Sequence, residues 1–174
     1  MNDELLKLSN QIADILKKSN HTVAVSESSS GGLISAHLLA IPGASAYFIG
    51  SAVLYTRKAS EAFINVTDDD LVGIRSATKE YALFNARRVK EMLGTTWGIA
   101  ETGASGPTGN RYGDPAGHSA IAIAGPVEES ITISTNNSDR ELNMIDFTKK
   151  TFEEFISVKG LKAQGNRLTT YKVK

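Results

Sequence analysis

Hydrophobic and polar positions along the chain follow a helical period in several segments. Residues 3–18 place leucine and isoleucine near one stripe, with lysine and aspartate opposite, which predicts an amphipathic helix. Glycines open a second helix that ends before Pro42. Further helices are predicted as one or two short ones within 57–72, a long one over about 77–93 with Ser76 as N-cap, and a last one that runs from the capping box Ser138-x-x-Glu141 to about Val158.

Short apolar runs between these helices predict strands. Residues 22–26, 49–56 and 96–102 are buried-strand candidates, and 119–124 with 130–135 read as a pair joined by a Gly-Pro turn. Strands that alternate with helices favour parallel pairing, and the final pair adds an antiparallel part. We therefore expect a single three-layer α/β/α domain with a mixed sheet and helices on both faces.

The charge distribution separates the end of the chain from the rest. The 174 residues carry no formal net charge, yet residues 159–174 hold five basic residues and no acid. We expect a domain over 1–158 and a basic C-terminal extension over 159–174. That extension is either a solvated tail or a contact for an anionic partner, and the sequence leaves both open.

Composition narrows the function classes. With no net charge overall, the chain offers no electrostatic reason to bind nucleic acid or a membrane. It has no cysteine, and His21, His37 and His118 lie in separate segments without ligand spacing, so we expect no metal site and no cofactor. No signal-peptide pattern or membrane-spanning run is visible, which favours a cytoplasmic protein.

Three segments carry candidate chemistry. The turn from Ser26 to Gly32 joins a strand end to a helix start, where backbone N–H groups favour an anion, although a serine-rich N-cap without a ligand gives the same pattern. Ser45 follows a tight turn near a tyrosine at a strand end, as a nucleophile beside its base would, or the segment is simply core. The glycine- and proline-rich stretch 103–117 follows another strand and is either a ligand loop or a plain surface loop.

Taken together, these segments resemble the C-terminal domain of the CinA (competence/damage-inducible) family. S-E-S-S-S-G-G-L-I is similar to the family's A-E-S-C-T-G-G-x-[IVL], and I-P-G-A-S-A-Y-F-I-G to [IV]-x-G-[SA]-S-x-x-[FW]-x-x-G. V-L-Y-T, T-G-A-S-G-P, D-P-A-G and S-D-R resemble V-x-Y-S, [ST]-G-x-A-G-P, K-P-V-G and G-D-R, in the family's order. The resemblance covers about residues 4–157.

The resemblance implies an amidohydrolase. Active family members hydrolyse the carboxamide of nicotinamide mononucleotide to the acid and ammonia without a metal, so the implied partner is a small nucleotide, with a homo-oligomer left open. The nucleophilic serine falls on Ser45, with Tyr55 and Ser28 as further catalytic residues. Substrate contacts fall on Thr102 and on Arg140 at the phosphate, and we extend them to the two glycine turns (Ser30, Gly31, Gly32, Gly103, Ser105 and Gly106). We expect one cleft to gather Ser28, Ser45, Tyr55 and Thr102, with a phosphate near Gly31–Gly32 or the 103–109 loop.

One position departs from the family. The strand tyrosine of the family is followed by S-N-E-A-K, whose lysine completes the catalytic group, and Ser60 stands at that position here. Lys58 is two residues earlier and so about 200° away around a helix, and Arg57 cannot act as a base. Two function classes therefore remain open. The first is an amidase acting on nicotinamide mononucleotide or a related pyridine nucleotide, and the second is a catalytically impaired member that binds a nucleotide or has a structural role.

Overall fold

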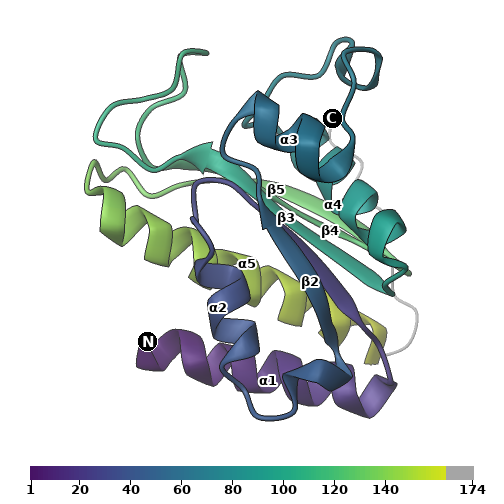
Figure 1. Ribbon diagram of the computed structural model, residues 1–174. Coiled ribbons are helices and arrows are strands. Elements are labelled where there is room, and N and C mark those ends of the chain that lie inside the picture. The colour runs from purple at the N-terminus through teal and green to yellow at the C-terminus, as the bar shows by residue number, and fades with distance from the viewer. Residues whose placement is uncertain (164–174) are drawn as a thin grey trace, which may run out of the picture.

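Five strands form one mixed sheet in the computed structural model, which describes residues 1–163 (Figure 1). The strand order is β2-β1-β3-β4-β5; β1 pairs in parallel with β2 and β3, and the β3–β4 and β4–β5 pairs are antiparallel. The strands are β1 (Val23–Glu27), β2 (Phe48–Val53), β3 (Trp97–Ala104), β4 (His118–Ala124) and β5 (Glu128–Ser134). The carboxyl ends of β1, β2 and β3 therefore meet at one edge of the sheet, and β2 is an outer strand.

Helices cover both faces of this sheet. On one face α1 (Asp3–Ser19), α2 (Leu33–Leu39) and α5 (Arg140–Ala163) pack against one another, and on the other face α4 (Lys79–Leu93) lies along β1, β3 and β4 with α3 (Arg57–Ile64) beside it (Figure 1). Two short 3₁₀ turns, η1 (Ala44–Ala46) and η2 (Asp69–Leu71), complete the described elements. The three-layer α/β/α prediction is confirmed.

The two layers pack differently against the sheet. The larger core lies under α1, α2 and α5 and contains bulky side chains such as Trp97, Phe152 and Phe155, all fully buried. On the other face α4 rests on a floor of alanines, and a Cβ atom at Gly98 would lie only 1.9 Å from the carbonyl oxygen of Ala86. Small residues thus let α4 approach the sheet closely.

Several predicted boundaries were wrong in detail. The N-cap of α4 is Thr78 rather than Ser76, since Ala77 between them has a positive φ of 61° and turns the chain before the helix begins. Asp139, not Ser138, caps α5 by accepting from the Leu142 amide at 3.0 Å. The helix then continues to Ala163, across the predicted boundary at 158. The rest of the basic extension, including Arg167, Lys172 and Lys174, lies outside the described residues.

Candidate active site

A polar cavity of about 730 Å³ opens at the carboxyl ends of β1, β2 and β3. It gathers residues from five separate segments of the chain. Ser28 follows β1, Tyr55 follows β2, and Thr102 with Gly103 comes from the end of β3, while further lining comes from the residues before and at the start of α4 and from the loop residues 110–112. This edge is where open α/β sheets place their ligands. Three of the four residues expected to share a cleft therefore do so.

A buried carboxylate organises the serine turn from within. Glu27 is fully buried, and its oxygens accept backbone N–H bonds from Gly32 at 2.9 Å, Ile34 at 3.1 Å and Ser35 at 2.9 Å. The hydroxyls of Ser30, at 3.0 Å, and Ser35 add two further donors. The side chain of Glu27 therefore occupies the start of α2 as a built-in anion.

A second buried carboxylate, Glu101 in the middle of β3, holds the other half of the turn. It accepts from the backbone amides of Ser28 at 3.3 Å and Ser30 at 2.8 Å, and from the hydroxyls of Ser29 and Ser119. The two glutamates share Ser30, which donates through its amide to one and through its hydroxyl to the other. Sequence reasoning missed both residues, although an acid within an otherwise apolar strand was a usable signal.

This arrangement corrects the expected phosphate position at Gly31–Gly32. The amide of Gly31 donates to the Ser28 carbonyl at 3.2 Å, and those of Gly32, Ile34 and Ser35 donate to Glu27. The amide donors that were expected to bind an anion are already used inside the protein. The two glycines instead allow the backbone turn before α2, with φ values of 65° and 99° that favour residues without a Cβ atom.

Tyr55 and Arg140 meet at the rim of the cavity. The Tyr55 side chain is 61% exposed, and its hydroxyl accepts a hydrogen bond from Nη2 of Arg140 at 3.2 Å. The Nη1 atom of the same guanidinium donates to the carbonyl oxygen of Gly106 at 2.7 Å. Within residues 1–163 no carboxylate lies within ion-pair distance of Arg140. An uncompensated cation therefore sits beside the Tyr55 phenol.

The first turn of α5 fixes the glycine loop as well. Asn143 lies one turn after Arg140, is fully buried, and donates to the carbonyl oxygens of Ser105 and Asn137, both at 2.8 Å. The Ser105 hydroxyl is buried and has no partner among the described residues. The loop after β3 is thus held from two points of α5, and Asn143 is a second positioning residue that the sequence did not single out.

Ser45 lies elsewhere in the chain. It is exposed in η1, which precedes β2, whereas Tyr55 follows β2. The six residues of β2 at about 3.3 Å each separate the two side chains by about 20 Å or more. The expectation of one cleft that includes Ser45 is therefore wrong within a single chain. Its catalytic role remains a prediction.

Position 60 faces the cavity wall rather than solvent. Ser60 is fully buried in α3, and its hydroxyl lies 3.4 Å from both the Thr56 carbonyl oxygen and the Tyr81 hydroxyl. Lys58 is exposed, and Arg57 is held by Glu61 at 2.9 Å and Asp68 at 2.8 Å. Neither neighbouring cation takes the position that the resemblance assigns to a lysine.

Comparison with known proteins gives the family. The model of the CinA C-terminal domain matches residues 5–159. The chain belongs to the CinA C-terminal domain family. A CinA-like protein from Myxococcus xanthus is 38% identical over 115 residues, which are 66% of this chain and 27% of that protein. A CinA-like protein from Salinibacter ruber is 32% identical over 143 residues, 82% of this chain and 35% of that protein. The chain thus spans about a third or less of these relatives' length.

Solved structures of the CinA superfamily share the fold. One from Klebsiella pneumoniae 700603 superposes with a TM-score of 0.84 at 19% identity, covering 92% of this chain and 99% of that one. The competence/damage inducible protein CihA from Agrobacterium tumefaciens gives 0.78 at 22% identity, covering 91% and 97%. At these identities the likeness supports the fold alone.

Two further arginines, Arg75 and Arg111, line the cavity in this CinA domain, and sequence reasoning missed both. Arg75 donates to both carboxylate oxygens of Asp114 at 2.5 and 2.9 Å and holds the pKa of that carboxyl at about 2. Arg111 donates to the Tyr112 hydroxyl at 2.7 Å and has no carboxylate partner within residues 1–163. An asparagine-arginine-tyrosine triplet inside a glycine-rich loop was the signal.

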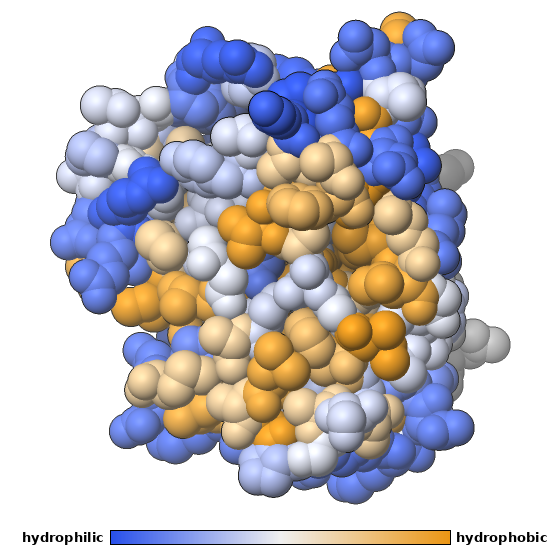
Figure 2. Space-filling model, in the orientation of Figure 1, coloured by the Kyte–Doolittle hydropathy of each residue, from blue (hydrophilic) through white to orange (hydrophobic). Residues whose placement is uncertain are grey.

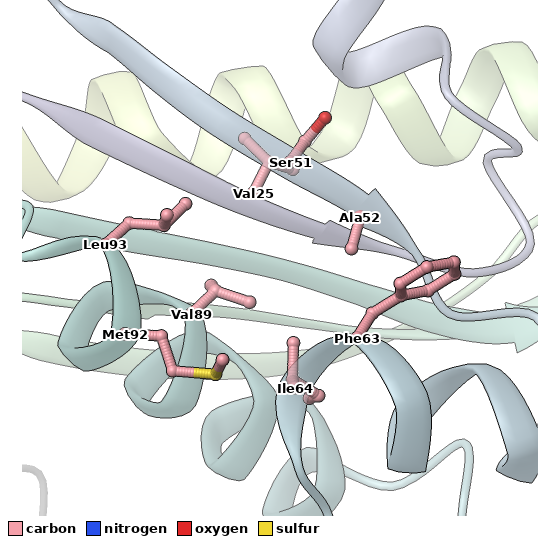
Figure 3. Close-up of a pocket in the computed structure, with 8 residues that line it drawn as sticks. All are labelled: Val25, Ser51, Ala52, Phe63, Ile64, Val89, Met92 and Leu93. Atoms are coloured by element: carbon pink, nitrogen blue, oxygen red, sulfur yellow. The ribbon is translucent and has the colours of Figure 1, made fainter.

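The outer strand of this CinA domain borders an apolar groove of about 230 Å³. Figure 3 shows Phe63 and Ile64 from α3 and Met92 and Leu93 from α4 around it, with Ala52 of β2 on the sheet side. Apolar side chains also gather over the middle of the face in Figure 2. The large hydrophobic residues with high exposed fractions include Ile49, Val53, Phe63, Met92 and Leu93. No helix within the described part of the chain is long and apolar enough to cross a membrane.

Proposed function

We propose that this CinA domain hydrolyses the carboxamide of nicotinamide mononucleotide or a related pyridine nucleotide, giving the carboxylate and ammonia. The observation that carries the proposal is the pairing of Tyr55 with Arg140 at a polar cavity that also contains Ser28 and Thr102. The Ser28 hydroxyl makes no hydrogen bond to another described residue, which leaves it free for a substrate. Amide hydrolysis needs a nucleophile, a proton carrier and a stabiliser of developing charge, and this edge of the sheet offers the last two.

The reaction assigns a role to each group. The Ser45 oxygen attacks the carbonyl carbon while its proton moves to the Tyr55 oxygen and the Tyr55 proton passes to the amide nitrogen, and the Arg140 guanidinium stabilises the charge that develops on the phenol oxygen. The tetrahedral oxyanion then collapses, the carbon–nitrogen bond breaks, and ammonia leaves. Water then attacks the acyl ester by the same proton path and regenerates the serine. Overall, the amide and one water molecule are converted to the acid and ammonia.

Because Ser45 and Tyr55 lie at opposite ends of β2, this mechanism requires a second copy of the chain. The outer edge of β2 has unpaired backbone groups, which soluble proteins usually cover. Two copies that pair antiparallel along β2 place the start of one strand against the end of the other. With the two-fold axis at the centre of β2, between Gly50 and Ser51, Ser45 of the second copy falls opposite Thr56, next to Tyr55.

The apolar surface beside β2 supports the same arrangement. Ile49 and Val53 on the strand are 48% and 41% exposed, and Phe63 on α3 is 62% exposed. Exposed apolar side chains on and beside an outer strand are typical of an obligate interface rather than of a surface that faces solvent. We therefore propose a two-fold dimer with two shared sites, each made of Tyr55 and Arg140 from one copy and Ser45 from the other.

Ammonia release tests the function directly. Purified protein is incubated with nicotinamide mononucleotide, nicotinamide riboside and other pyridine nucleotides, and ammonia and the acid product are measured in parallel. We expect equal amounts of both from a nucleotide substrate, and loss of both in Ser45→Ala. Absence of turnover on the whole panel, from a protein that is folded and dimeric, would refute the amidase.

The competing candidate is a nucleotide-binding protein without turnover. The specific observation in its favour is Ser60, which is buried against Tyr81 where the family pattern has a lysine. Calorimetric binding of nicotinamide mononucleotide without ammonia release, in both wild type and Ser60→Lys, would make this the better account.

A further inference from the structure

The loop between β3 and β4 brings a pair of adjacent side chains, Arg111 and Tyr112, into the wall of the cavity. Two guanidinium groups lie near the Tyr112 ring, with the Arg111 Cζ atom 4.9 Å and the Arg75 Cζ atom 5.4 Å from the ring centroid. Both distances are in the range of cation–π contact. Two cations and one phenol therefore lie together in the lining of the cavity, Arg111 and Tyr112 from this loop and Arg75 from the segment before α4.

The two cations differ in what neutralises them. Arg75 is bound through both nitrogens to Asp114, and its charge is balanced. Arg111 uses one of its five N–H groups on the Tyr112 hydroxyl and has no carboxylate partner among residues 1–163. Four donors and a full positive charge of Arg111 therefore remain free for a ligand. Arg57, the third arginine of the lining, is balanced by Glu61 and Asp68.

The tip of the loop is held in place before any ligand binds. The Asn110 side-chain oxygen accepts from the amides of Tyr112 at 2.9 Å and Asp114 at 3.1 Å, and its amide nitrogen donates to Asp114 at 2.8 Å. The backbone amide of Asn110 donates to the Asp114 carbonyl oxygen at 3.0 Å, and Gly113 donates back to Asn110 at 3.2 Å. Arg75 in turn holds Asp114, so the loop loses little conformational entropy when a ligand binds.

Tyr112 strengthens the preference for an anion. Hydrogen bonds with Arg111 and then Ser76 lower the pKa of Tyr112 below its usual value. An acidified phenol is a better hydrogen-bond donor to an anionic oxygen than an ordinary one. The planar guanidinium beside it matches two oxygens of a phosphate at once.

We infer that Arg111 and Tyr112 form a binding subsite for the phosphate monoester of the substrate. The inference rests on the proposed function only for the identity of the ligand, a pyridine nucleotide. In the proposed reaction the carboxamide lies at Tyr55, so the substrate binds with its phosphate toward the loop.

Calorimetry with probes that differ only in the phosphate tests the subsite without requiring turnover. The probes are nicotinamide mononucleotide, nicotinamide riboside and inorganic phosphate, titrated into the wild-type chain and into Arg111→Ala, Arg111→Lys and Tyr112→Phe. Arg87→Ala is the matched control, since Arg87 lies on α4, pairs with Glu128 and does not line the cavity. Circular dichroism checks that each variant is folded.

We expect Arg111→Ala to weaken mononucleotide binding by about 10- to 100-fold, as loss of charge-assisted hydrogen bonds does, and to leave riboside binding unchanged. Arg111→Lys should recover part of the loss, Tyr112→Phe should cost a smaller factor, and Arg87→Ala should cost nothing. Weak binding of inorganic phosphate that also depends on Arg111 supports the subsite.

If Arg111→Ala loses affinity equally for the mononucleotide and the riboside, or loses affinity for neither, the inference is overturned. The proposed function can fail separately. Wild type could fail to bind the nicotinamide compounds but bind another phosphate monoester, such as adenosine monophosphate, with an affinity that depends on Arg111. In that case the phosphate subsite is supported and the proposed pyridine nucleotide substrate is wrong. If wild type binds no phosphate monoester at all, the subsite is wrong.

Discussion

The guanidinium of Arg140 lies 3.2 Å from the Tyr55 oxygen and 2.7 Å from the Gly106 oxygen, so one side chain joins the phenol at the end of β2 to the loop at the end of β3. The resemblance to CinA proteins assigns this arginine to the phosphate, and that role stays a prediction. In the structure its guanidinium contacts Tyr55, the residue proposed to carry the proton. Arg140 thus supplies a cation beside Tyr55 in a chain that lacks the family lysine at position 60.

The first prediction is that Arg140→Ala lowers kcat on nicotinamide mononucleotide by about 10²-fold, because a preorganised charge next to a reacting group commonly contributes that much. Arg140→Lys should keep part of the rate. KM should change less than kcat, since the contact is to Tyr55 rather than to the phosphate. Steady-state kinetics of the three proteins, with Arg87→Ala as control, measures this. A large rise in KM with unchanged kcat would instead support the phosphate role.

The second prediction concerns the buried carboxylate of Glu27. Glu27→Gln replaces an acceptor oxygen by an NH₂ group that faces the amides at the start of α2, so donors meet donors. We expect the free energy of unfolding to fall by about 2–4 kcal/mol in urea denaturation. Glu153→Gln, which removes only a surface ion pair with Lys150, should change it by less than about 0.5 kcal/mol. Equal stabilities of the two variants would contradict the role given to Glu27.

The third prediction concerns the Arg75–Asp114 pair that anchors the cavity loop. Arg75 lowers the pKa of Asp114 from 3.8 to about 2 in the folded state. The folded protein therefore holds on to that proton less than the unfolded chain does, and the pair stabilises the fold above about pH 4. This contribution, about 1 kcal/mol for a partly exposed pair, is lost as the pH falls toward 2.

Asp114→Asn should remove the same contribution. We expect wild type to be more stable than this variant at pH 7 and the difference to shrink steadily between pH 4 and pH 2, as followed by chemical denaturation at each pH. A difference that is constant over this range would mean that the charge of Asp114 is not what stabilises the loop.

The fourth prediction is that Ser60→Lys raises the amidase rate. Ser60 lies 3.4 Å from the Tyr81 hydroxyl, and Tyr81 lines the cavity, so a lysine at this position can extend its ammonium toward the site. Catalytic groups of this kind contribute about 10² to 10⁴ in rate. The larger side chain in a fully buried position should cost about 1–3 kcal/mol of stability. Ammonia release and urea denaturation measure the two effects.

Two control variants show whether the effect of Ser60→Lys comes from the new ammonium group. Ser60→Ala removes the weak hydroxyl contacts and should leave the rate unchanged. Lys58 is exposed, so Lys58→Ala should also have no effect. Wild-type turnover that is lost in Lys58→Ala would show that Lys58 already acts at the site, against the position that α3 gives it.

The sequence predicted the architecture because its cues are local. The helical stripe of α1 and the serine- and glycine-rich turns after β1 and β3 each follow from a few neighbouring residues. The site was harder to predict because its geometry depends on direction along a strand. Ser45 and Tyr55 are ten residues apart, which suggests proximity, yet an extended strand between them places them at opposite ends of β2.

Long-range side-chain contacts explain the other misses. The Gly31–Gly32 turn has the pattern of an anion site, and only the folded chain reveals that Glu27 fills it. Glu101 reaches the same turn from 71 residues away through the Ser30 amide, and Arg75 reaches Asp114 across 39 residues. No periodicity or motif encodes such pairs, because they arise from how the strands are ordered in the sheet.

The last prediction tests the shared site by complementation. Ser45→Ala and Tyr55→Phe should each be inactive alone, since each removes one half of every site. In a dimer that pairs along β2, a heterodimer of the two variants regains one intact site, with Tyr55 and Arg140 from the first chain and Ser45 from the second. Random exchange makes about half of all dimers heterodimers, each with one of its two sites intact. Unfolding and refolding an equal mixture should therefore restore about a quarter of the wild-type rate.

The mass of the oligomer and variants at the interface test the proposed dimer itself. Light scattering should give twice the mass of the chain, and Leu93→Asp, which places a charge in the groove beside β2, should give monomers that are folded and inactive. Lys79→Asp on the same helix, away from that groove, is the control. If the mixture of variants stays inactive while wild type refolded in parallel recovers, Ser45 and Tyr55 do not serve one shared site. If Leu93→Asp is monomeric and fully active, the site is complete within one chain, and a nucleophile other than Ser45 must lie in the cavity with Tyr55, for which Ser28 is the nearest candidate.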